Sequence, residues 1–73
     1  MTISAYLTST LPTLPEEVKD YVVAILRENA DEITSKDDVI EAVGEHIQSS
    51  VEGLSDEAMR NVCEKLMLLL HGG

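Results

Sequence analysis

The sequence predicts an all-α fold, a small bundle of four helices of which the first is short. Apolar residues recur at spacings of three and four in four separate segments, 3–11, 14–28, 36–48 and 56–71. Polar connections separate these segments. The chain has 73 residues, of which 44% are hydrophobic and only 3% aromatic. We therefore expect a single domain over residues 1–73 with an aliphatic core.

The first predicted helix, residues 3–11, has the weakest pattern. Ile3, Tyr6 and Leu7 follow helical spacing, whereas the threonines and serines of this segment lower its helix propensity.

The second predicted helix, residues 14–28, begins with stronger signals. Thr13 and Glu16 have the spacing of a capping box, and Pro15 suits the first turn because a missing N–H costs little there. One apolar stripe follows, made of Val18, Tyr21, Val22, Ile25 and Leu26. In the polar connection after this helix, we expect Ile33 to fold back onto the core.

The third predicted helix, residues 36–48, follows Ser35, whose hydroxyl can cap the first turn. Gly44 lies within this helix, where it costs up to about 1 kcal/mol relative to alanine. Close approach of another helix would explain it, and so would a local bend. The expected core face consists of Val39, Ile40, Val43 and Ile47.

The fourth predicted helix, residues 56–71, starts after Ser55 and has the most regular stripe. Its members are Met59, Val62, Cys63, Leu66, Met67 and Leu70. Leu68 and Leu69 make the end of this helix apolar on nearly all sides. Either the first helix covers this belt through Tyr6 and Leu7, or the belt docks another protein or the rest of a longer polypeptide.

Acidic residues dominate the charge. Fourteen Asp and Glu oppose five Lys and Arg, which gives a net charge of -9 without any basic cluster. Such a chain repels nucleic acid and anionic membranes, and a basic protein partner suits it better. One acidic ridge runs along the third predicted helix, formed by Asp37, Asp38, Glu41 and Glu45. This ridge is either a solvated face or a contact for Lys and Arg of a partner.

No catalytic or cofactor motif is apparent. The four glycines do not form a phosphate-binding loop, and His46, Cys63 and His71 lack the paired spacing of a zinc site. Cys63 lies on an apolar stripe, which predicts a buried packing residue instead of a nucleophile. We expect no enzyme activity, no cofactor and no metal in this segment.

Small acidic helical bundles also include the acyl carrier proteins, which need an exposed serine at a helix start. Ser35 and Ser55 occupy helix starts, but neither lies in the Asp-Ser-Leu setting of that family. Both are explained as helix caps.

The single cysteine argues for a reducing compartment, because secreted domains of this size usually depend on disulfides. The chain begins without the pattern of a secretory signal, and it lacks an apolar run of membrane-spanning length. The expected location is the cytoplasm.

Three stretches resemble the extreme N-terminus of eukaryotic ABC-F ATPases, subfamily F member three, the general control translational regulators. They are Asp20-Tyr21-Val22, the run from Ser35 to Glu45, and Val62-Cys63. The resemblance implies a PWI-like helical bundle ahead of two ATP-binding cassettes. It also implies docking to the ribosome-associated HEAT-repeat co-activator of the starvation-responsive initiation-factor kinase.

The resemblance assigns roles to residues and leaves alternatives. The acidic ridge is the implied shared surface, and the side of Leu68 and Leu69 is a second candidate for partner binding. ATP and Mg would belong to the downstream cassettes. The chain departs from the family pattern at His46. It also lacks the Pro-Trp-Ile signature and the basic flank of RNA-splicing PWI domains, so no nucleic-acid binding is expected. An acyl-carrier-like protein or a freestanding helical adaptor is the alternative. The implied packing positions are Tyr21, Val22, Val39, Val43, Gly44, Val62 and Cys63.

Overall fold

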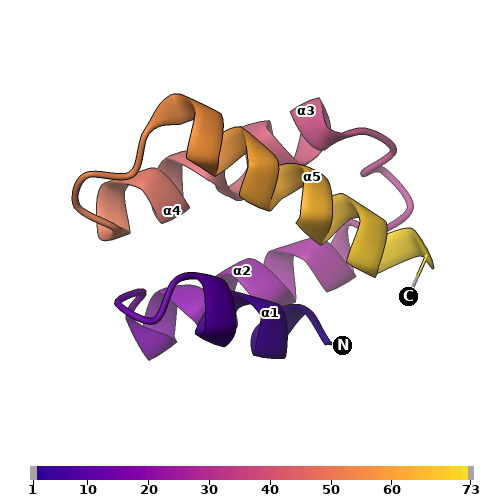
Figure 1. Ribbon diagram of the computed structural model, residues 1–73. Helices are drawn as coiled ribbons and strands as arrows, with labels where there is room; N and C mark the ends of the chain where they lie inside the picture. Colours follow the sequence, from indigo (N-terminus) through magenta and orange to yellow (C-terminus); the bar gives the residue numbers. More distant parts are fainter. Residues whose placement is uncertain (1, 73) are drawn as a thin grey trace.

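A computed structural model describes residues 2–72, which form four helical segments and no strand (Figure 1). The helices α1 and α2 form one pair, and the third segment packs with α5 as a second pair across it. The all-α prediction is confirmed. The bounds are α1 (Ile3–Thr10), α2 (Glu16–Glu28), a third segment made of α3 (Lys36–Val39), η1 (Ile40–Gly44) and α4 (Glu45–Ser50), and α5 (Asp56–Gly72).

The core lies between the two helix pairs and is aliphatic, as the composition predicted. Among residues 2–72, no polar or charged side chain is buried in it. Burial of apolar surface is therefore the main stabilising term. The largest fully buried side chains come from every helical segment; they are Leu7, Leu26, Ile47, Leu66, Val22, Val39, Val43 and Cys63.

Helix α1 is short and is fixed at both ends. The Thr2 hydroxyl caps its start by accepting a hydrogen bond from the Ala5 N–H at 3.0 Å. Leu7 is its one buried residue and packs into the core, and α1 contacts both α2 and α5. The ammonium of Lys19 on α2 donates to the Thr8 hydroxyl at 3.0 Å. The helix ends at Thr10, one residue before the predicted end.

The capping box predicted from Thr13 and Glu16 is wrong. Helix α2 begins at Glu16 with Pro15 as its N-cap, and no side chain caps it. The reason lies in Leu14, which is only 8% exposed and whose N–H donates to the Leu11 carbonyl at 3.0 Å. The chain turns before α2 to bury Leu14, so the helix starts two residues later than predicted.

Tyr21 is not a packing position in the core, contrary to the prediction. Its side chain is 45% exposed, whereas Val22 and Leu26 on the same helix are fully buried. The α2 stripe is centred on Val22 and Leu26. Tyr21 precedes Val22 by one residue, and the helical rotation of about 100° per residue places it at the rim of that stripe.

The third helical segment runs from Lys36 to Ser50 with a π-helical turn, η1, in its middle. Gly44 ends this turn and is buried. A Cβ atom at Gly44 would lie 3.1 Å from the Met59 sulfur of α5 and 3.2 Å from Ile40 Cγ2. The expected close approach of another helix is therefore present, together with a local change of helical geometry.

Contacts at the two ends of the bundle join the connections and the helices beside them. Ile33 is 3% exposed, which confirms its predicted place against the core. The His71 ring, at the end of α5, hydrogen-bonds through Nε2 to the Ile33 carbonyl. At the other end, Gln48 of α4 donates to Asp56 Oδ1 at 2.6 Å. The start of α1 and the end of α5 lie at the same end of the bundle (Figure 1).

Candidate functional site

The acidic ridge lies on the third helical segment, largely in solvent. Asp37, Glu41 and Glu45 are exposed, and Asp38 is half-buried. The four carboxylates therefore differ in exposure: three are accessible to a partner, and the fourth, that of Asp38, is partly covered.

The carboxylate of Asp38 is engaged in hydrogen bonds at the start of its own helix. Its Oδ2 accepts hydrogen bonds from the Thr34 N–H at 3.1 Å, the Thr34 hydroxyl at 3.2 Å and the Ser35 hydroxyl at 3.4 Å. These bonds, those from Thr34 first, hold the pKa of Asp38 below its usual value. The Ser35 hydroxyl in turn accepts from the Asp38 N–H, which confirms Ser35 as the cap.

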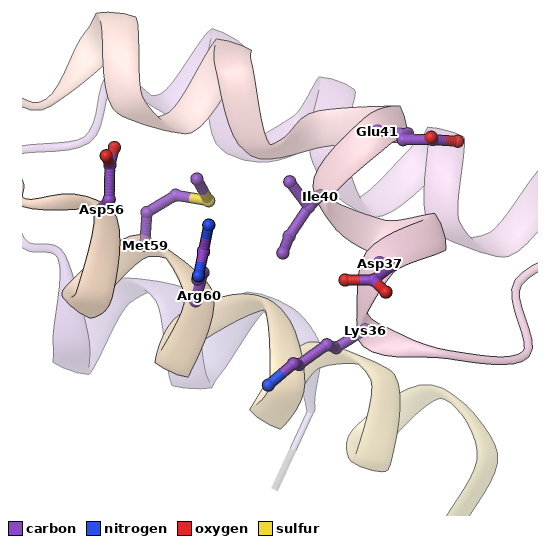
Figure 2. A pocket seen from close by; sticks show the side chains of 7 residues that line it. All are labelled: Lys36, Asp37, Ile40, Glu41, Asp56, Met59 and Arg60. Carbon is purple, nitrogen blue, oxygen red and sulfur yellow. The ribbon is translucent and has the colours of Figure 1, made fainter.

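A groove of about 500 Å³ lies between α3, η1 and the start of α5, and we call it the α3–α5 groove. Figure 2 shows Met59 and Ile40 between the two helices, with Arg60 beside Met59 and the Glu41 carboxylate turned away from both. Met59 is buried and Ile40 half-buried, so the floor is apolar. The groove is lined by Lys36, Asp37, Ile40, Glu41, Asp56, Met59 and Arg60.

This lining combines three carboxylates and two cationic side chains around an apolar floor. Such a surface suits recognition of a mixed polar and apolar protein segment.

Glu41 also borders a second groove of about 400 Å³ between the end of α2 and η1, the α2–α3 groove. Here it is joined by Asp38 and Glu32 around Ile25 and Ile33. Glu45 lines neither groove. The structure thus brings Asp37 and Glu41 to one groove and Asp38 and Glu41 to the other.

Leu68 and Leu69 do not form one patch. Leu68 is 51% exposed, whereas Leu69 is half-buried and lines a small recess with Ile3 and Arg27 near the start of α1. Met67 and Leu70 pack against the core and α1 contacts α5, so the apolar end of α5 is partly covered. A single exposed leucine is ordinary on a protein surface.

The structure separates the three residues that could resemble a metal or catalytic site. Cys63 is fully buried, and burial raises its pKa to about 11. His71 bonds the Ile33 carbonyl, and His46 lies against Tyr21. Within residues 2–72, no three His, Cys, Asp or Glu side chains gather as metal ligands.

Ser55 is a helix cap, as predicted, because its hydroxyl accepts from the Ala58 N–H at 3.1 Å. Both serines that stand at the predicted helix starts are thus engaged by backbone groups. Over the residues described, the helices are too short or too polar for any of them to cross a bilayer.

The surface around Tyr21 and His46 was not predicted from the sequence. Their rings lie 4.9 Å apart between centroids at 71°, joining α2 to α4. The position of Tyr21 at the edge of its apolar stripe was the one sequence signal that could have indicated this exposure.

Comparisons with known proteins agree with this geometry. A family model described as the PWI-like helical bundle domain of ABCF3 matches residues 1–73. ATP-binding cassette sub-family F member 3 of Homo sapiens and that of Mus musculus are each 35% identical to the chain over 66 residues. The match covers 89% of this chain but 9% of the length of those relatives. No solved structure matches the chain.

Proposed function

Because the chain belongs to the family of PWI-like helical bundle domains of ABCF3, we propose that it is the non-catalytic protein-interaction domain of a translation-linked ABC-F ATPase. The match over the whole chain is the observation on which the proposal depends. In this proposal, the domain stands at the N-terminus and works in the cytoplasm. Its partner is the ribosome-associated HEAT-repeat co-activator that acts in amino-acid starvation control of translation.

The surface supports an interaction role. Asp37, Glu41 and Glu45 are exposed on one helical segment. Asp37 and Glu41 line the α3–α5 groove, and Glu41 also lines the α2–α3 groove. HEAT repeats are stacked helix pairs that form extended binding surfaces. Basic side chains on such a surface would be steered toward a chain of net charge -9 and would pair with the ridge.

Catalysis belongs elsewhere in the parent protein under this proposal. The sequence contains no GxxxxGK[ST] loop, so the backbone cradle that holds nucleotide phosphates is missing from it. The carboxylates around the α3–α5 groove would also repel a triphosphate. ATP and Mg would bind in the downstream cassettes.

The test is direct binding between the purified chain and the purified HEAT-repeat co-activator, measured by biolayer interferometry at several salt concentrations. The double variant Glu41→Lys with Glu45→Lys reverses two exposed charges of the ridge. We expect its affinity to fall about tenfold or more, equal to about 1.4 kcal/mol, with a weaker dependence on salt.

The matched control is Glu16→Lys with Glu28→Lys, which makes the same change of charge on the exposed ends of α2. It should bind within about threefold of the unmodified chain if the ridge is specific. An equal loss of affinity in both double variants would mean that net charge, and not the position of the ridge, determines binding. Absence of binding by the unmodified chain would contradict the proposed partner.

A further inference from the structure

A third groove lies between α2 and α4 and is separate from the acidic ridge. It encloses about 440 Å³. Tyr21 and Val18 of α2 form one wall, and His46 of α4 forms the other. Glu17, Ser49 and Ser50 complete its lining. We call it the Tyr21–His46 groove.

The aromatic wall is open to solvent. Tyr21 is 45% exposed although it is one of only two aromatic residues from the Phe, Trp and Tyr group in the chain. Its ring makes an edge-type contact with the His46 ring, at 4.9 Å between centroids and an interplanar angle of 71°. A tyrosine that is half-exposed in a groove is a type of side chain enriched among the residues that contribute most to binding at protein interfaces.

The groove contains a negative charge and lacks a lysine or arginine in its lining. Glu17 is its only acidic or basic residue apart from His46. Ser49 and Ser50 are the last residues of the third helical segment, where the carbonyl end of the helix dipole is negative. By contrast, Lys36 and Arg60 line the α3–α5 groove. A cation is therefore favoured in the Tyr21–His46 groove.

We propose that the Tyr21–His46 groove binds an arginine side chain of a partner protein, together with an adjacent aliphatic residue. The guanidinium stacks on the Tyr21 ring and pairs with the Glu17 carboxylate, and the aliphatic residue packs on Val18. Arginine suits this lining better than lysine because its planar group stacks on aromatic rings and bonds carboxylates in two places. The inference rests on the proposed function only in taking the partner to be a protein.

The experiment is an NMR titration of the ¹⁵N-labelled chain with the blocked dipeptide acetyl-Leu-Arg-amide. Acetyl-Leu-citrulline-amide is the matched ligand, since citrulline keeps the shape of arginine and lacks its charge. We expect saturable shifts at the amides of Tyr21, His46 and Ser49, with a Kd on the order of 1–10 mM. The citrulline dipeptide should bind at least fivefold more weakly.

Two variants locate the site. Tyr21→Leu removes the ring, and Glu17→Gln removes the exposed charge. Each variant should bind the arginine dipeptide at least threefold more weakly. Glu17→Gln changes no core residue, so it keeps the test valid if Tyr21→Leu perturbs the fold. Lys36→Gln in the α3–α5 groove should leave the Kd unchanged.

Equal binding of the two dipeptides would overturn the inference, and so would shifts centred on Glu41 and Glu45 in place of the groove. The titration needs no partner protein. A negative titration would therefore contradict the arginine site without contradicting the proposed co-activator. Likewise, absence of co-activator binding would not contradict a positive titration.

Discussion

At the scale of single residues, Asp38 shows how one carboxylate of a charged run can serve the fold. Its three hydrogen bonds with Thr34 and Ser35 close the loop onto the start of α3. Asp37, the next carboxylate, is exposed. Neighbouring acids with the same sequence signal therefore have different roles.

This difference predicts a pH dependence. Because hydrogen bonds lower the pKa of folded Asp38, its stabilising effect is present above the ordinary aspartate pKa of about 3.9 and is lost as the pH falls through the lower folded value. Asp38→Asn should lower the thermal midpoint at pH 6, and the difference from the unmodified chain should shrink as the pH falls further below about 3.9. Asp37→Asn is the control, and scanning calorimetry is the measurement. Equal effects of the two variants across this pH range would contradict the prediction.

Cys63 gives a second prediction at this scale. Burial raises its pKa to about 11, so only about one thiol in a thousand would be ionised at pH 8, and the side chain is also inaccessible. Labelling with Ellman's reagent in native buffer should be at least about 100-fold slower than in urea, because reaction requires opening of the core. Rapid labelling of the folded chain would show that α5 detaches from the core.

At the scale of elements, periodicity identified all four helical segments but not their detailed boundaries. The stripe on α5 was predicted well because Met59, Val62, Cys63 and Leu66 are all buried. The start of α2 was predicted wrongly, because burial of Leu14 outweighed the local capping pattern. Tertiary packing decides such cases, and periodicity within one helix contains no information about it.

The grooves were less predictable than the helices. The acidic ridge was visible in sequence, but its neighbours Arg60 and Asp56 come from α5 and meet it only through packing. Gly44 lies at this contact, where an added Cβ atom would come within 3.1 Å of the Met59 sulfur. The π-helical turn has no sequence signature of its own, so the spacing of the ridge along the helix could not be derived from the sequence.

A matched pair of leucines tests the helix packing. Leu7 is the one buried residue of α1, and Leu68 is 51% exposed on α5. Leu7→Ala should lower the free energy of unfolding by about 2–5 kcal/mol. This is a large part of the roughly 4–11 kcal/mol total expected for a domain of this size. Leu68→Ala should change stability by less than about 0.5 kcal/mol. Urea denaturation followed by circular dichroism measures both, and similar losses would mean that α1 does not seal the core.

At the scale of the whole molecule, the charge of -9 is spread over a small bundle without a buried charge among the residues described. Apart from Asp38, the acids on α2, the third segment and α5 are exposed to solvent, so they repel one another across the surface. The same field attracts a basic partner. Salt should therefore act on folding and on binding with opposite signs.

This opposition can be measured by varying the salt concentration. Raising NaCl from 20 to 300 mM shortens the screening length from about 20 Å to about 6 Å, which weakens the repulsion between carboxylates on different helices. The free energy of unfolding should rise by about 0.5–1 kcal/mol, or roughly 2–8 °C in thermal midpoint, while affinity for the basic partner falls. Glu41→Gln with Glu45→Gln should diminish both responses, because it removes two of the repelling and attracting charges. A thermal midpoint that falls with salt would show that attractive ion pairs, and not repulsion, dominate the surface.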